Sequence, residues 1–318
     1  MIKAGICYCD TPRAAELLRV LINHPDVELR WVARDGAAGV RVDSIVPGLI
    51  GECDMQTIDI RDADVDGVDV VFACGAPGQS HPWQDVAATL DDENTTRWID
   101  LSDTHGTADG DQWTLGMPEM MRRVLVHDCY RAWVPGAGAI ASLLTLLPLA
   151  RNLLLTSPVT LRLAVGQGIL PCVTGGMDTA AWLQQQQQQV ADALAVCQAS
   201  FAQPLQLDLT TLRQQRVMAV AARVRCGVSE SMLRELYEQY YDDHNFVFIV
   251  DRTVGAADVE NTNKCLLRLV KDDRQGTLTV YAVMDAWLKG CAGTAVHVMN
   301  LMFGLHERVG LQLKATGC

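Results

Sequence analysis

Residues 2–22 read IKAGICYCDTPRAAELLRVLI, and this stretch decides the fold of the N-terminal half. Ile2–Tyr8 is a short apolar run, typical of a buried strand. Asp10 or Thr11 can cap a helix immediately afterwards, and Pro12 suits its first turn. Apolar residues then recur at helical spacing, at Ala14, Leu17, Leu18, Leu21 and Ile22. A strand followed at once by a helix favours the opening of a doubly wound nucleotide-binding sheet.

Further apolar runs extend this pattern. Val27–Ala33, Val68–Cys74 and Trp98–Leu101 are predicted strands, and the second is apolar along nearly its whole length, as expected of a strand covered on both faces. After about Pro135 the predicted pattern of helices and strands changes. Ile140–Leu154 is a predicted long apolar helix, and a hairpin is predicted over residues 265–283, with its turn at residues 271–276. The 318 residues therefore suit two domains, an α/β domain followed by an α+β domain.

The composition excludes several classes of protein. The net charge is −12 and the pI is about 4.9, which argues against a general nucleic-acid binder. No apolar run approaches the roughly 20 residues that span a bilayer, and no secretion signal is recognisable. Eleven cysteines, an odd number, favour reduced thiols, and Cys7 and Cys9 lack the spacing of a zinc site. We expect a cytoplasmic protein without a membrane segment, nucleic-acid partner or metal.

Short motifs along the chain carry a more specific signal. They are Asp100–Ser102, Leu115–Glu119, Val134–Gly136 with Leu143–Leu149, Asn263 with Cys265, Leu288–Gly293 and Met299–Leu305. In this order they resemble the motifs of N-acetyl-gamma-glutamyl-phosphate reductases, NADP-dependent enzymes of arginine biosynthesis. The resemblance implies a Rossmann-type dinucleotide-binding domain over residues 1–136, completed by a C-terminal helix in 291–318. It also implies a glyceraldehyde-3-phosphate-dehydrogenase-like α+β domain over 137–290, through which a homo-oligomer forms.

The same resemblance implies a mechanism. A cysteine attacks an acyl phosphate, a thioester forms, NADPH delivers hydride, and a histidine acts as the base. The cysteine is expected directly after Pro135 and Gly136, where this chain has Ala137. A methyl group cannot attack an acyl phosphate. Cys129 or Cys172 would be a substitute thiol, and we favour an inert role for both.

The position of the base is altered as well. The family has a histidine-x-histidine-x-proline-glutamate segment before a helix, and by position Gln184–Gln189 stands there. Glutamine cannot shuttle a proton near neutral pH. No histidine occurs between His127 and His244, and His244 lies in a polar stretch that suggests the surface. The composition of the glutamine run allows either an ordered helix start or a flexible loop.

The nucleotide-binding turn has lost its glycines. A dinucleotide-binding turn needs them for its tight geometry and for close approach to the pyrophosphate. Tyr8, Thr11 and Ala14 stand at the matching places, and Asp10 would repel a pyrophosphate from the helix N-terminus.

Some cofactor-binding features remain. Arg34 follows the second strand, where arginine favours the 2′-phosphate of NADP. Gly75, Gly78 and Ser80 follow the third strand, and Asn300, like Lys289, lies in the family's C-terminal segment. We take Arg34, Gly75, Gly78, Ser80 and Asn300 as the candidate cofactor residues. NADP binding is possible but weakened or lost.

Three functions are compatible with these departures. The first is a non-catalytic homologue that acts as a structural or regulatory partner, pairing with itself or with an active paralogue. The second is an NADP-dependent oxidoreductase with changed chemistry on a thioester, imine or aldehyde. The third is the family's own reaction, with the nucleophilic cysteine replaced experimentally by Ala137. Because nucleophile, base and phosphate turn are all altered, we favour the first.

Overall fold

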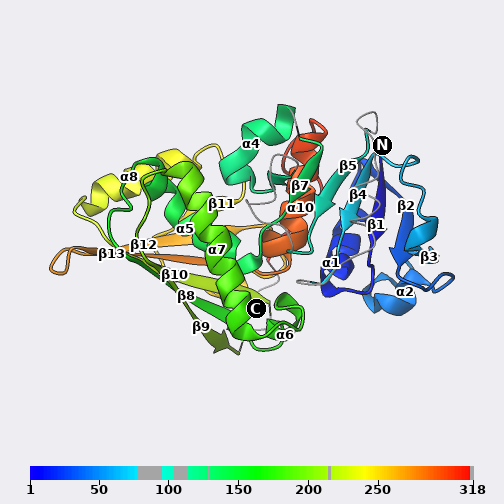
Figure 1. Ribbon diagram of the computed structural model, residues 1–318, viewed down its shortest axis with the longest axis horizontal. Coiled ribbons are helices and arrows are strands. Elements are labelled where there is room, and N and C mark those ends of the chain that lie inside the picture. Colours follow the sequence, from blue (N-terminus) through cyan, green and yellow to red (C-terminus); the bar gives the residue numbers. More distant parts are fainter. Residues whose placement is uncertain (77–94, 104–112, 128, 214–215, 316–318) are drawn as a thin grey trace. The chain divides into compact units, whose positions relative to one another are not determined.

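The computed structural model describes residues 1–76, 95–103, 113–127, 129–213 and 216–315 (Figure 1). They form two compact units. One contains Met1–Pro135 and Cys291–Gln312, and the other contains Gly136–Gly290 with residues from Leu313 onwards. Each unit is described separately below. Gly78 and Ser80, two candidate cofactor residues, lie outside the described residues.

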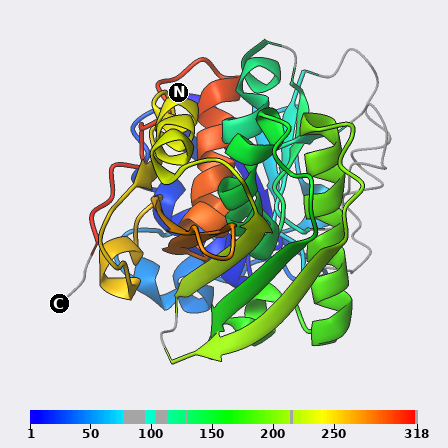
Figure 2. The same ribbon diagram turned by 90° about the vertical axis from the view of Figure 1, so that its left-hand side faces the viewer.

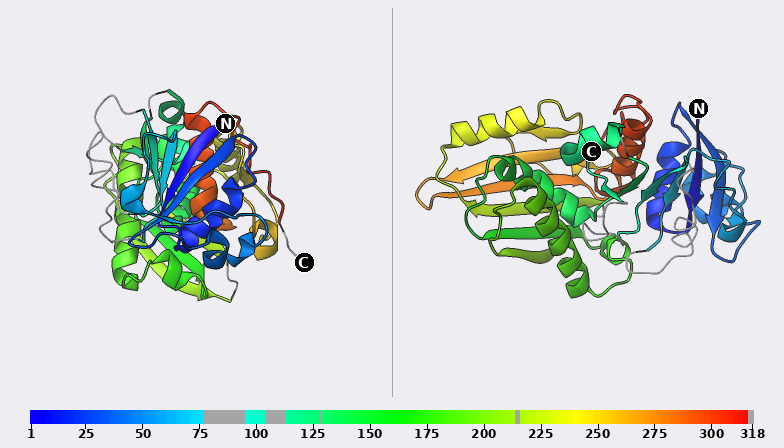
Figure 3. Two further views of the ribbon diagram at one scale, coloured as in Figure 1. Left: turned by 90° about the vertical axis from the view of Figure 1, so that its right-hand side faces the viewer. Right: turned by 45° about the horizontal axis from the view of Figure 1, so that its top comes forward.

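The first unit is built on a seven-stranded sheet in the order β3-β2-β1-β4-β5-β7-β6 (Figure 3, left). Its strands are β1 Ile2–Cys7, β2 Val27–Arg34, β3 Ile58–Asp59, β4 Val70–Ala73, β5 Arg97–Asp100, β6 Thr114–Leu115 and β7 Arg131–Trp133. Every described pairing in this sheet is parallel. The strand order reverses between β1 and β4, where doubly wound folds bind their ligands. The predicted Rossmann-type fold is thus confirmed.

Helices of the first unit are α1 Pro12–Leu21, α2 Val42–Ile45, α4 Pro118–His127 and α10 Gly293–Met302, with 3₁₀ turns η1 Pro47–Leu49 and η2 Ile60–Asp62. α1 begins as predicted, because Thr11 is its N-cap and Pro12 occupies its first position. α10 packs against both α1 and α4. The last described helix therefore belongs to the unit that contains the first strand.

The second unit has a six-stranded sheet in the order β11-β12-β13-β10-β8-β9 (Figure 2). Its strands are β8 Val159–Gly166, β9 Leu205–Leu212, β10 Val217–Arg225, β11 Val247–Ile249, β12 Cys265–Asp272 and β13 Thr277–Asp285. β12 and β13 form the predicted hairpin, which closes at the pair Asp272 and Thr277. The three inner pairings are antiparallel, whereas both edge strands pair in parallel.

Helices of the second unit are α5 Ala137–Arg151, α6 Leu170–Val173, α7 Thr179–Cys197, α8 Glu230–Tyr241 and α9 Ala256–Val259, and a π-helical turn, η4, spans Leu288–Ala292. α5 starts three residues before the predicted Ile140, because its small first residues also pack inside. It ends at Arg151, before Leu153 adopts a left-handed conformation. None of the helices that the structure describes is both long and apolar enough to cross a membrane.

α5 forms the core of the second unit. Each of its residues except Arg151 is buried, and it contacts β10, β13, α7 and α8. A helix that is apolar all round needs cover on every side. Its internal Pro148 lacks an N–H, so the Leu144 carbonyl, four residues earlier, loses its helical donor. The Tyr241 hydroxyl of α8 donates to this carbonyl at 2.6 Å and replaces the missing bond.

The compensation of Pro148 by Tyr241 can be measured in a double-mutant cycle. We expect Tyr241→Phe to lower the free energy of unfolding by about 1–3 kcal/mol, because a buried carbonyl loses the hydroxyl that replaces its helical donor. The cost should be smaller in a Pro148→Ala background, where an alanine N–H can donate to Leu144. Urea unfolding of the four proteins measures the coupling, and Tyr281→Phe, at an exposed tyrosine, is the control. Equal costs in both backgrounds would contradict this pairing.

Candidate active site and nucleotide-binding edge

The first turn of α5 is the place where the resemblance expects the nucleophile. Ala137 is the first residue of the helix and is buried. Gly136 is the N-cap and has no side chain to accept a hydrogen bond. The start of a helix leaves four backbone N–H groups without helical acceptors, here those of residues 136–139. In a buried position they need other partners.

Two glutamine side chains supply such partners. The N–H of Gly136 donates to Gln189 Oε1 at 3.1 Å, and the N–H of Ala139 donates to Gln186 Oε1 at 3.0 Å. Both glutamines are buried. The glutamine run is therefore neither a helix start nor a flexible loop. It lies inside α7, which begins at Thr179 after its cap Asp178.

The methyl group of Ala137 is closely covered. A Cβ added to Gly290 would lie 2.8 Å from the Ala137 Cβ, so only a glycine fits against it. Gly290 is held by the turn after β13. The buried carboxylate of Asp285 accepts from the N–H groups of Trp287 and Leu288 at 2.9 and 3.0 Å and binds Arg216 Nε at 2.9 Å. Lys289, beside Gly290, is completely buried.

The candidate substitute thiols lie elsewhere. Cys129 belongs to the first unit, where its Sγ donates to the Arg131 carbonyl at 3.6 Å. Burial raises the pKa of Cys129, which keeps it a neutral thiol. Cys172 is half-buried on α6. His244 was predicted to lie on the surface, but it is half-buried. Its ring stacks on Tyr240 with the ring centroids 5.9 Å apart.

The turn after β1 keeps the shape of a glycine turn without the glycine. Tyr8 has a φ of 61°, in the left-handed region that glycine prefers. Its ring is buried in a cluster with Trp31 and Trp98. Thr11 Oγ1 accepts from the Ala14 N–H at 3.2 Å and donates to the Cys74 carbonyl at 2.7 Å. The N-terminus of α1 is therefore capped from within the chain.

Charged groups at this edge are paired with one another. The guanidinium of Arg34 lies 3.6 Å from the Asp10 carboxylate. Arg13, buried in the first turn of α1, donates to the Gly75 carbonyl at 3.3 Å. A pyrophosphate here would face the Asp10 carboxylate and the capped N-terminus, so the described residues do not fit it well. Arg34 and Gly75 lie at this edge, and their assignment to a cofactor stays a prediction.

Asn300 holds a different position. Its Oδ1 lies 3.1 Å from His24 Nε2, and its Nδ2 donates to the carbonyls of Glu307 and Val309 at 3.2 and 2.9 Å. His24 Nδ1 in turn accepts from the Asp26 N–H at 3.2 Å. Asn300 thus ties the C-terminal segment to the loop after α1. Its assignment to a cofactor stays a prediction.

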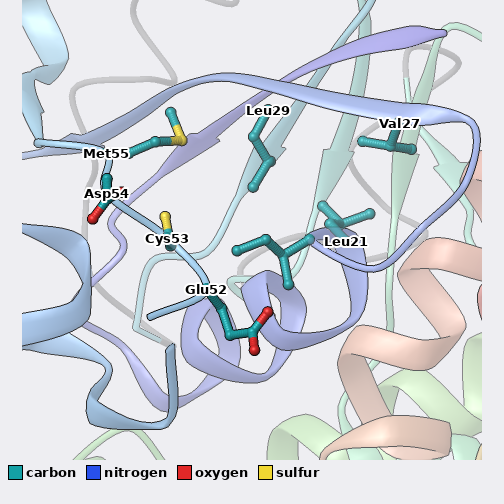
Figure 4. A pocket seen from close by; sticks show the side chains of 8 residues that line it. Leu21, Val27, Leu29, Glu52, Cys53, Asp54 and Met55 are labelled. Atoms are coloured by element: carbon teal, nitrogen blue, oxygen red, sulfur yellow. The ribbon is translucent and has the colours of Figure 1, made fainter. Parts of the chain in front are cut away.

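A small pocket of about 180 Å³ lies at the other edge of this sheet (Figure 4). Leu21, Ile22, Val27 and Leu29 line one part of it, and residues 52–55 line the other. Val27 is the first residue of β2, whereas Arg34 is its last. The pocket is therefore remote from the turn that contains Tyr8 and Thr11.

Comparison with known proteins defines the class. The sequence matches the NAD-binding domain of semialdehyde dehydrogenases over residues 13–127 and their dimerisation domain over 195–286. The fold resembles aspartate semialdehyde dehydrogenase II of Vibrio cholerae, complexed with ASA (TM-score 0.69, 14% identity, 96% of this chain and 99% of that chain). It also resembles a probable aspartate-semialdehyde dehydrogenase from Pseudomonas aeruginosa (TM-score 0.71, 12% identity, 95% of this chain and 98% of that chain). The chain has the semialdehyde dehydrogenase fold.

Full-length relatives narrow this class. N-acetyl-gamma-glutamyl-phosphate reductases of Phocaeicola vulgatus and Bacteroides thetaiotaomicron are 35% and 34% identical over 328 residues. That of Parabacteroides distasonis is 32% identical over 326 residues, and each match covers 99% of both chains. This chain belongs to the N-acetyl-gamma-glutamyl-phosphate reductase family, as its motifs predicted.

The His24–Asn300 contact predicts an acid-sensitive fold. Burial, the largest cause, lowers the pKa of His24. The unfolded chain takes up a proton near pH 6.5 while folded His24 resists it, so stability falls as the pH drops below about 6.5. We expect the difference in unfolding free energy between the wild type and His24→Gln to shrink from about pH 7.5 to about pH 5. A difference that stays constant over this range would contradict the assignment.

Proposed function

We propose that this chain is a non-catalytic member of its family that acts as a structural or regulatory partner. The observation that supports this most directly is the first turn of α5. There a methyl group stands at the nucleophile position, and the carboxamides of Gln186 and Gln189 accept the surrounding N–H bonds. The thioester route needs a thiolate and a proton acceptor, and neither group provides one.

We also propose that binding of NADP is weakened. Thr11 already occupies the N-terminus of α1, and Asp10 adds a carboxylate at the same corner. Arg34, the candidate for the 2′-phosphate, is paired with this carboxylate. The alternative of a working NADP-dependent oxidoreductase with changed chemistry relied on Arg34 and the loop after β4, and the pairing of Arg34 makes it the weaker proposal.

A family member without catalytic activity can still form an oligomer. We propose a homo-oligomer formed through the second unit, which contains the match to the dimerisation domain. An active paralogue with the same interface would be an alternative partner. In either case the conserved fold serves the interface, while the altered residues lie at the nucleophile and cofactor positions.

Loss of catalysis can be tested with an acyl phosphate and NADPH. We expect no turnover by the wild type and no covalent acyl adduct on the intact protein by mass spectrometry. Ala137→Cys should also lack turnover, because glutamines stand at the position of the base. Sustained turnover by the wild type, or an adduct on any residue of the second unit, would refute the proposal. Recovery of full activity in Ala137→Cys would favour an experimental replacement instead.

Weakened cofactor binding can be tested by calorimetry. We expect Asp10→Asn to raise the affinity for NADPH by roughly 2- to 5-fold, because the repulsion between an exposed carboxylate and a neighbouring pyrophosphate is screened by water to about 0.3–1 kcal/mol. Asp54→Asn, at an exposed carboxylate lining the remote pocket, is the matched control. Equal affinities of wild type and Asp10→Asn, including no binding by either, would contradict the role given to Asp10.

A further inference from the structure

Gln186 and Gln189, the two buried glutamines of α7, have contacts that go beyond filling the position expected for a histidine. Gln186 and Gln189 are one helical turn apart, so their side chains leave α7 on the same face. Their carboxamide oxygens accept hydrogen bonds from the backbone N–H groups of Gly136, the N-cap of α5, and of Ala139, its third residue. An anionic group at position 137 would depend on these same donors and on the positive end of the helix dipole.

The local packing fits these carboxamides closely. A Cβ added to Gly136 would lie 2.3 Å from both Nε2 and Oε1 of Gln186. At Gly138 it would lie 3.2 Å from Gln186 Oε1 and 2.7 Å from Leu163. Gln186 therefore rests directly on the backbone of the first turn. All these residues belong to the second unit and are buried or lie in its core.

We propose that Gln186 and Gln189 are a second block on covalent chemistry, independent of the missing thiol. They occupy the N–H donors that would stabilise a thiolate at the start of α5. A thiol restored at position 137 then stays neutral, and removal of the two carboxamides lowers its pKa. This inference rests on the proposed function, because it concerns the same helix N-terminus. It adds a role for the two glutamines that stand where the family has its base.

The alternative is that the glutamines only fill space. In that case methionine, which has nearly the volume of glutamine but no carbonyl acceptor, can replace both residues without changing the ionisation of a neighbouring thiol. A thiol at a helix N-terminus with free donors has a lowered pKa, whereas burial alone raises it. The two explanations therefore predict different ionisation of the same introduced group.

The experiment compares Ala137→Cys with Ala137→Cys/Gln186→Met/Gln189→Met. Alkylation by iodoacetamide is followed at position 137 by peptide mass spectrometry, which separates the introduced thiol from the eleven native cysteines. The readout is the pH midpoint of the rate, and methionine keeps the volume of glutamine so that the burial of the introduced thiol is similar in both proteins. Nearby charges, Lys289 and the Arg216–Asp285 pair, are the same in both proteins.

We expect the midpoint to fall by about one pH unit or more when both glutamines are removed. Ala137→Cys/Gln188→Met is the matched control, since Gln188 is exposed and bonds Asp192 at 2.7 Å. It should leave the midpoint unchanged. If the triple variant does not fold by circular dichroism, Ala137→Cys/Gln186→Met is measured instead, with a smaller fall expected.

An unchanged or raised midpoint in the folded variant would overturn this inference, as would an equal fall in the Gln188 control. Neither result depends on catalysis. The proposed function fails separately, through turnover or an acyl adduct of the wild type, so the two failures can be told apart.

Discussion

The start of α5 inside the second unit imposes a requirement that shapes the surrounding sequence. A buried N–H without an acceptor costs about 1–3 kcal/mol, and a helix that begins in the interior has four of them. Here two carboxamides meet part of this requirement. A neutral amide does so without the desolvation cost of a buried charge. Gly136 and Gly138 leave room for this arrangement, because a larger residue at either position would displace Gln186.

The first unit meets the same requirement in another way. α1 begins at the edge of a parallel sheet where its class binds nucleotides, and its own Thr11 accepts the first-turn bond. The neighbouring Asp10 and Arg34 neutralise each other. Each unit thus contains a helix N-terminus at which side chains of the same unit accept backbone N–H bonds. The left-handed Tyr8, at a cost of roughly 1–2 kcal/mol for a residue with a side chain, gives this turn a backbone conformation that glycine adopts more readily.

Local signals predicted the elements well. Thr11 and Pro12 gave the start of α1, and the polar turn at 271–276 gave the β12–β13 hairpin. The inward-facing glutamines were harder to identify from the sequence, because six identical consecutive residues show no apolar periodicity that marks a buried face. The spacing of Trp182, Val190 and Leu194 marks the buried face of α7 and could have singled out Gln186 and Gln189. The bond between His24 and Asn300 joins residues 276 positions apart, and no local pattern announces such a contact.

The contacts around Ala137 bear on the proposal that the first turn of α5 does not support covalent chemistry. A single replacement of a cysteine by alanine would leave the base position and the helix cap as they are in active relatives. In this chain the methyl group lies against Gly290, and two glutamines accept N–H bonds on either side of it. Gly136 and Gly290 belong to motifs that resemble those of the family, so the departure lies in Ala137 and in the glutamines of α7. The carboxamides of Gln186 and Gln189 satisfy two N–H groups of the helix start with neutral side chains, and this arrangement needs no ionisable group at position 137.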